Sequence, residues 1–276
     1  MSDSGKILTR PEFPRSAKYD PDWMMDNQMG PSAIWLTEWL CEKLELKPGM
    51  RILDLGCGKA MSSIFLAREF DVRVWAADLW MGPDQNWKRA GEAGVSDLIC
   101  PIKAEAHSLP FAEGFFDAVV SFDAYQYFGT DDLYLDYLAR FVRPGGFLGI
   151  VVVGLMQEMT SGPPGYLTQP QSNGRVFWEE SCRCFKTQEF WQSLWAGCPY
   201  VSDIQVDALE DGWRHWRDFE MALETAGKGI FPSEAEALDK DQGQYMGFLR
   251  LLATRTEKVG MNMYDPALGT KVRLDK

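Results

Sequence analysis

Ile52-Leu53-Asp54-Leu55-Gly56-Cys57-Gly58-Lys59-Ala60 is the stretch of sequence that decides the fold. It joins a short apolar run, Arg51–Leu55, to an amphipathic stretch, Met61–Phe70, so a glycine-rich turn links a predicted strand to a predicted helix. Glycines at 56 and 58 let the backbone turn sharply and approach a ligand closely, where a side chain would collide. The turn delivers that ligand to a helix N-terminus, whose free N–H groups attract a carboxylate.

Strands and helices alternate on both sides of this turn. Apolar runs predict further strands at 72–77, 98–103, 116–121, 147–153, 201–206 and 244–254. Helices are predicted at 85–93, 132–141, 187–196, 213–226 and 231–240. Upstream, a helix is expected to begin at Gly30-Pro31 and to end at Lys47-Pro48-Gly49. This alternation is typical of an α/β protein with a parallel sheet and helices on both faces.

Two acidic residues narrow the choice of ligand. Asp54 precedes the glycines, where a carboxylate would disfavour a pyrophosphate but suit a ligand that carries an ammonium and a sulfonium group. Asp78 follows the strand at 72–77, twenty residues after Gly58, and is placed to accept from both hydroxyls of a ribose. The alternative is that both are ordinary acids of strand-end loops.

With these features, the sequence of 45–155 resembles the class I S-adenosylmethionine-dependent methyltransferases, especially the bacterial small-molecule branch. The resemblance rests on the Asp54–Gly58 turn, Asp78, Ala104-Glu105-Ala106 followed by Leu109-Pro110-Phe111, Phe116-Asp117-Ala118-Val119-Val120-Ser121, and Arg143-Pro144-Gly145-Gly146. It implies a Rossmann-like, mostly parallel sheet of seven strands, with helices on both faces and an antiparallel last strand.

The resemblance also implies which residues bind S-adenosylmethionine. Gly56 and Gly58 pass under its methionine part, Asp78 binds the ribose, and Ser121 lines the floor. Glu105 and the amide of Ala106 bind the adenine. The full expected set is Asp54, Gly56, Cys57, Gly58, Asp78, Leu79, Glu105, Ala106 and Ser121. The family often has a third glycine where Ala60 stands, so we expect a slightly wider turn there without lost binding.

The acceptor is expected to lie beside the segment after the fourth strand, where the candidate pocket residues are Asp123, Tyr125, Gln126 and Tyr127. In similar enzymes this segment faces the methyl group, often with a histidine about where Tyr127 stands. We take Tyr125, Tyr127 and His215 as candidate catalytic residues. The alternatives are that the tyrosines pack a helix start and that His215 belongs to an aromatic interfacial helix. A base is needed only if the acceptor arrives protonated.

The other histidine, His107, is expected to be a surface or turn residue. At the N-terminus, residues 1–19 are expected to be flexible or loosely docked, and the Trp- and Met-rich segment 19–31 either folds over the cofactor or simply packs. The expected organisation is an arm or lid at 1–30 and a single methyltransferase domain at 31–276. Within that domain the cofactor-binding core spans 45–155 and substrate-covering insertions span 156–242.

Composition limits the partners. The 28 basic and 40 acidic residues give a net charge of −12, which disfavours nucleic acid because such binders neutralise phosphates with Lys and Arg. No apolar run is long enough to span a bilayer and no signal-peptide core is seen, so a cytoplasmic location without a membrane partner is expected. The six cysteines show no zinc-type spacing, so no metal is expected. The oligomeric state is not predicted.

The predicted function is transfer of a methyl group from S-adenosylmethionine to nitrogen, oxygen, sulfur or carbon of a small molecule. Asn-Pro-Pro-Tyr, which grips planar amino groups in nucleic-acid methyltransferases, is absent, and Ser121-Phe122-Asp123-Ala124 stands in its place. The alternative is a regulatory or scaffolding protein that binds S-adenosylmethionine without methyl transfer. A nicotinamide dehydrogenase is disfavoured by Asp54 before the glycines and Ala60 after them.

Overall fold

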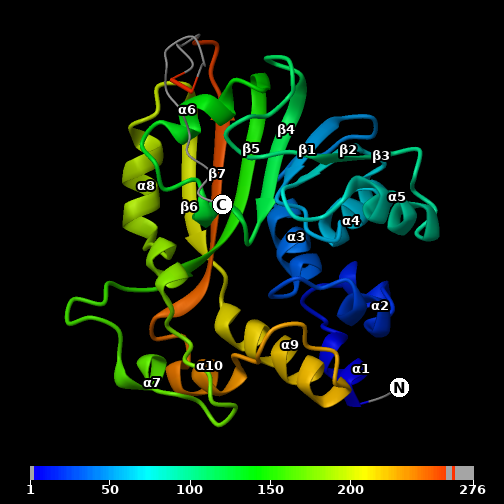
Figure 1. Ribbon diagram of the computed structural model, residues 1–276. Coiled ribbons are helices and arrows are strands. Elements are labelled where there is room, and N and C mark those ends of the chain that lie inside the picture. The colour runs from blue at the N-terminus through cyan, green and yellow to red at the C-terminus, as the bar shows by residue number, and fades with distance from the viewer. Residues whose placement is uncertain (1–2, 259–262, 265–276) are drawn as a thin grey trace.

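The computed structural model describes residues 3–258 and 263–264, so 259–262 and 265–276 of the expected domain lie outside the described residues. The strands are β1 (Arg51–Leu55), β2 (Arg73–Asp78), β3 (Ile99–Lys103), β4 (Phe116–Phe122), β5 (Val142–Leu155), β6 (Val201–Ala208) and β7 (Met246–Arg255). They form one sheet in the order β3-β2-β1-β4-β5-β7-β6 (Figure 1). The five neighbouring strands β3, β2, β1, β4 and β5 are parallel to one another. Strand β7 runs antiparallel to both β5 and β6, as expected.

The strand order places the ligand-binding edge. The chain builds outward from β1 to β3 and then returns to lay β4 on the other side of β1. The connections that leave β1 and β4 therefore diverge, and a crevice opens between them at the carboxyl ends of the strands.

Helices cover both faces of the sheet (Figure 1). On one face lie α3 (Ala33–Cys41), α4 (Met61–Phe70) and α5 (Pro83–Glu92), and on the other α6 (Tyr134–Ala139) and α8 (Gln188–Ala196). Alternate residues along each strand enter separate cores, Ile52 with Val74 on one side and Leu53 with Leu148 on the other. The apolar runs that predicted these strands are therefore buried on both faces of the sheet.

A second group of helices lies beyond the carboxyl edge of the sheet (Figure 1). It contains α1 (Asp3–Leu8), α2 (Pro21–Asp26), α7 (Gly165–Thr168), α9 (Gly212–Ala226) and α10 (Ala235–Asp241). For residues 3–19 the expectation of a loosely docked arm is wrong, because α1 packs against α9 and the side chains of Leu8 and Phe13 are 1% and 2% exposed; residues 1–2 lie outside the described part of the chain. Sequences far apart in the chain thus cover the same edge of the sheet.

Two element boundaries differ from the predicted ones by more than four residues. Helix α3 ends at Cys41 rather than near Lys47, because Lys43 N donates to Leu40 O and Leu44 N to Cys41 O in a tighter turn. Strand β5 begins at Val142, because the expected turn at 143–146 forms an irregularity within the β4–β5 pairing instead.

Within the described residues, no helix combines the length and the apolar content needed to cross a bilayer.

Candidate active site

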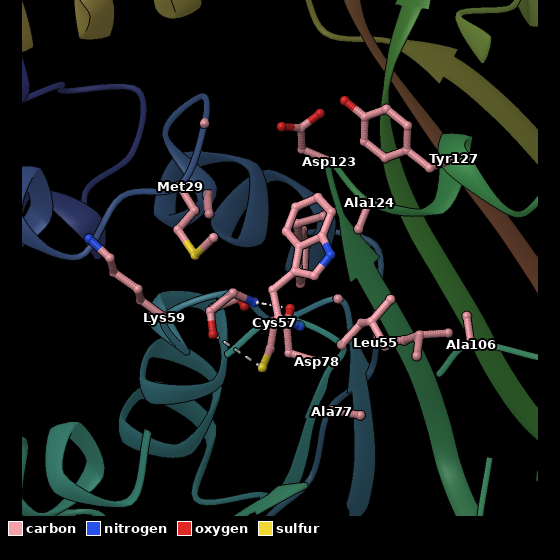
Figure 2. Close-up of a pocket in the computed structure, with 18 of the residues that line it drawn as sticks. Met29, Leu55, Cys57, Lys59, Ala77, Asp78, Ala106, Asp123, Ala124 and Tyr127 are labelled. Atoms are coloured by element: carbon pink, nitrogen blue, oxygen red, sulfur yellow. Dashed lines mark hydrogen bonds between the residues drawn. The ribbon is translucent and has the colours of Figure 1, made fainter. Parts of the chain in front are cut away.

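A cavity of about 490 Å³ opens where the carboxyl ends of β1, β2 and β4 meet. The turns after these strands line one side of it, and the N-terminal segment 27–33 lines another. In Figure 2, Asp78 and Cys57 lie at the lower end of the view, and Asp123 and Tyr127 lie together at the upper end. The cavity therefore extends from the tip of β2 to the loop after β4.

The glycine turn has no room for side chains. Gly56 N donates to Ala77 O and Gly58 N donates to Asp78 Oδ2, both at 2.8 Å, and the two glycines have φ of +76° and +51°. A Cβ on Gly56 would lie 2.4 Å from Cβ of Ala124 in the loop after β4. The turn is thus held between β2 and β4 by contacts that require glycine.

Ala60 takes the left-handed conformation that a third glycine would take, with φ of 61°. Ala60 N donates to Cys57 O at 2.8 Å, which closes the turn. The left-handed conformation costs alanine backbone strain that glycine would not have.

Asp54 lies beneath the turn and does not line the cavity, contrary to the expectation that it contacts the ligand. Its Oδ2 accepts hydrogen bonds from the hydroxyls of Ser62 and Ser63, both at 2.6 Å. Its Oδ1 has no hydrogen-bond partner among residues 3–258 and 263–264. Burial raises the pKa of Asp54 to about 6 against the opposing effect of the two hydroxyls. The carboxyl fixes the start of α4 and leaves negative charge under the turn.

Asp78 lines the cavity at the end of β2. Its Oδ1 accepts from the backbone N–H groups of Trp80 and Met81, and its Oδ2 accepts from Gly58 N, each at 2.8 Å. A carboxylate offers about four acceptor positions, so these three bonds leave capacity for a hydroxyl donor from a ligand. Asp78 both shapes the turn and presents charge to the cavity.

Glu105 and Ala106 line the cavity after β3. Glu105 Oε1 contacts His107 Nδ1 at 2.7 Å, and Oε2 accepts from His107 N at 2.9 Å. The His107 ring packs against Tyr134, with centroids 5.0 Å apart. His107 is thus a turn residue, as expected, and it orients Glu105 at the wall of the cavity.

Of the remaining cofactor-binding residues expected from the sequence, Cys57 and Leu79 line the cavity and Ser121 does not. Ser121 is fully buried, and its hydroxyl donates to Leu55 O at 2.6 Å. It ties β4 to the end of β1 below the cavity, so the prediction that it lines the floor is wrong.

Among the candidate catalytic residues, Tyr127 lines the cavity and Tyr125 does not. Tyr125 is fully buried against Trp191 and Trp195, with ring centroids 5.7 and 6.0 Å away. The 3-10 turn at Tyr125–Tyr127 points one ring into the core and leaves the other exposed. For Tyr125 the alternative of packing therefore fits the structure.

His215 lies on α9, outside the residues that line the cavity. Its ring packs edge-on against Phe13 and Trp35, with centroids 5.1 and 6.0 Å away. Burial lowers the pKa of His215, and the positive charge of Arg10 lowers it further. The catalytic role expected for His215 has no geometric support, and the alternative of an aromatic interfacial helix describes it.

Comparison with known proteins identifies the core of this fold. Residues 53–150 match a family described as a methyltransferase domain. Residues 53–150 form a methyltransferase domain. The resemblance to methyltransferases expected from the sequence is confirmed for this region, and solved structures with a similar fold are described in complex with S-adenosylmethionine. The domain match includes the glycine turn and ends within β5.

The relatives and solved structures that match this chain are distant in sequence. Methyltransferase GfsG of Streptomyces halstedii is 27% identical over 165 residues, so the chain spans 59% of that protein and the match covers 58% of this chain. The structure of the [4+2]-cyclase SpnF superposes with a TM-score of 0.60 at 22% identity, covering 85% of this chain and 86% of that one. Geranyl diphosphate C-methyltransferase from Streptomyces coelicolor gives 0.65 at 14% identity, covering 92% and 98%. At these identities the two structures show the fold alone.

Some residues line the cavity of the methyltransferase domain without having been predicted to do so. Trp80 lies two residues after Asp78, the acid at the end of β2, and its side chain is 76% exposed. A large apolar residue just after that acid is the sequence feature that could have predicted it. Ser181 lies in the 3-10 turn Glu180–Cys184 and reaches the cavity from the region after β5. No local pattern could predict Ser181, because its position depends on how 156–187 folds back over the sheet edge.

Proposed function

We propose that this chain transfers the methyl group of S-adenosylmethionine to a small-molecule acceptor through a nitrogen, oxygen, sulfur or carbon nucleophile. The observation that carries the proposal is that one cavity contains the glycine turn and Asp78 at one end and Asp123 and Tyr127 at the other. When bound, S-adenosylmethionine supplies a methyl group on a positively charged sulfur. A small-molecule partner also agrees with the net charge of −12, which disfavours phosphate-rich polymers.

The residues at the turn fit the parts of this cofactor. Backbone groups of Gly56 and Gly58 at the start of α4 would hold the amino-acid tail, and the buried charge of Asp54 with its unpartnered Oδ1 favours a cationic group nearby. Asp78 retains acceptor capacity for the ribose hydroxyls. Ala106 and its neighbours after β3 would hold the adenine.

The chain's contribution to catalysis would be positioning and exclusion of water. Methyl transfer is an in-line displacement, so holding the acceptor atom about 3 Å from the methyl carbon supplies much of the acceleration. Met29, Gly30 and Pro31 line the cavity from the N-terminal side, which supports a lid at 1–30. We accordingly propose a single domain at 31–276, with a cofactor core at 45–155 and acceptor-covering insertions at 156–242.

A second candidate function is binding of S-adenosylmethionine without methyl transfer. It is supported by the position of Tyr125 and His215 outside the cavity, which leaves no histidine base among the described lining residues. The similar fold of the [4+2]-cyclase SpnF agrees with this second function, since the name of that protein describes a cyclisation and not a methyl transfer.

Incubation with methyl-labelled S-adenosylmethionine and a small-molecule cell extract separates the two functions. Mass spectrometry should find a metabolite that gains one methylene, with one S-adenosylhomocysteine formed for each methyl transferred. The control is Gly56→Val, whose side chain would collide with Ala124 and block the turn. Cofactor binding without transfer to any extract fraction would favour the binding function instead.

A further inference from the structure

Asp123 has a carboxylate oxygen that the protein leaves open to the cavity. It follows β4, and its Oδ1 accepts a hydrogen bond from Nε2 of the fully buried Gln126 at 2.8 Å. Its Oδ2 has no hydrogen-bond partner within the described part of the chain. Gly30 passes so close that a Cβ there would lie 2.7 Å from this oxygen. Gly30 of the proposed lid segment therefore lies against the free oxygen, while Asp123 stays partly exposed.

The backbone holds Asp123 in this position at some cost. Its φ is 51°, in the left-handed region that few residues other than glycine, asparagine and aspartate adopt, and its N–H donates to Val151 O at 2.9 Å. A strained backbone conformation persists only where the surrounding contacts hold it in place. Residues in such conformations are frequent at ligand-binding sites.

A carboxyl group of the helical region lies near Asp123. Glu234 at the start of α10 interacts with Asp123, and burial followed by the like charges of Glu220 and Asp123 raises the pKa of Glu234 to about 8. Within the described residues, no lysine or arginine forms an ion pair with Asp123, Glu220 or Glu234. Carboxylates that gather in a buried region without a cation are stabilised when a cation binds.

The ionisation of Asp123 agrees with the binding of a cation beside it. Burial raises the pKa of Asp123 to about 7, opposed by the hydrogen bond from Gln126. The titratable groups that face it are Tyr127, Cys184 and Glu234. A carboxylate that titrates near neutral pH can both hold a cation and take up a proton.

Aromatic residues also line the cavity near Asp123. Phe122, Tyr127 and Phe128 line it, and Figure 2 shows Tyr127 beside Asp123. Aromatic rings stabilise both apolar groups and cations that lie over their faces. A ligand that fits this end thus combines a positive group with an apolar body.

We propose that the acceptor is an amine carried on an apolar body, and that Oδ2 of Asp123 binds its ammonium group and takes up the proton. This inference rests on the proposed methyltransferase function. In the proton transfer, an N–H bond of the ammonium breaks, an O–H bond forms at Oδ2, and the nitrogen keeps the electron pair that makes it a nucleophile. The proton then passes from Asp123 to water. Anionic acceptors are disfavoured by the same carboxylate.

Binding to the complex with S-adenosylhomocysteine tests the proposal without any turnover. Tryptophan fluorescence is titrated with 2-phenylethylamine and with 3-phenylpropionate, which carries a similar body and the opposite charge. The amine should bind at least tenfold more tightly than the acid. In Asp123→Asn the amine should lose at least tenfold in affinity, while S-adenosylhomocysteine binds within twofold of the wild type. Asparagine tolerates the left-handed backbone and can still accept from Gln126, so the variant should fold.

A matched control is Asp203→Asn, which alters an exposed aspartate of β6 with a similar φ of 54° and should change neither affinity. An amine that binds no better than the acid, or that binds Asp123→Asn as well as the wild type, overturns this inference alone. Failure of the wild type to bind S-adenosylhomocysteine would instead overturn the proposed function.

Discussion

At the scale of single residues, Asp78 connects the structure of the turn to its proposed chemistry. One oxygen holds the backbone after β2 through Trp80 and Met81, and the other holds Gly58. The same carboxylate faces the cavity. A change at Asp78 therefore affects both the shape of the turn and the acceptors offered to a ribose.

Asp78→Asn should weaken binding of S-adenosylhomocysteine at least tenfold, which corresponds to about 1.4 kcal/mol. The amide replaces one acceptor with a donor and removes the charge that strengthens hydrogen bonds to ligand hydroxyls. Calorimetric titration measures the change, and circular dichroism checks that the variant is folded. A folded variant with wild-type affinity would remove Asp78 from the proposed ribose site.

Single residues also show how far sequence reasoning extends. Gly56, Gly58 and Asp78 could be predicted to share a site because the turn and the strand tip are read from contiguous sequence. Tyr125 and Tyr127 could not be told apart, since a 3-10 turn sends neighbouring side chains to different environments. His215 was misread because its surroundings, Phe13 and Trp35, come from remote parts of the chain.

At the scale of elements, the strands of the parallel sheet were predictable because buried strands are apolar runs bounded by turns. The start of α10 illustrates what the sequence does not reveal. Glu234 at its N-terminus meets Glu220 of α9, and burial followed by this like charge raises the pKa of Glu234 to about 8. The folded protein thus keeps a proton there that the unfolded chain loses near pH 4.5. The resulting stability is present at low pH and lost as the pH rises toward 8.

Glu234→Gln should therefore raise the melting temperature of the ligand-free protein at pH 9 and leave it nearly unchanged at pH 5. Glutamine resembles the protonated acid but cannot acquire the buried charge. The control is Glu236→Gln on the same helix, because the hydrogen bond from Lys240 lowers the pKa of Glu236 to about 2. That variant should gain no stability at pH 9. Equal melting temperatures for Glu234→Gln and the wild type at pH 9 would contradict the account.

At the scale of the whole molecule, the N-terminal region and the helices after β6 form one cover over the carboxyl edge of the sheet (Figure 1). Phe13 is central to this contact, since its ring stacks on Trp35 of α3 at 5.8 Å and meets His215 of α9 at 5.1 Å. The sequence suggested a loose arm because prolines and polar residues interrupt it. Leu8, Phe13 and Tyr19 are nevertheless buried.

Phe13→Ala should lower the free energy of unfolding by about 3–5 kcal/mol, the usual loss for a buried aromatic ring. Phe231→Ala serves as the comparison, since that ring is 58% exposed and its removal should cost less than about 0.5 kcal/mol. Urea unfolding measures both. Similar losses for the two variants would mean that the N-terminal region is not packed as described.

The central claim is that the cavity at the β1–β4 crevice binds the adenosyl amino-acid cofactor. Titration calorimetry of the wild-type chain with S-adenosylhomocysteine, and separately with NAD, tests it most directly. We predict saturable binding of one S-adenosylhomocysteine per chain and no saturable heat with NAD. Saturation by NAD without any binding of S-adenosylhomocysteine would contradict the account.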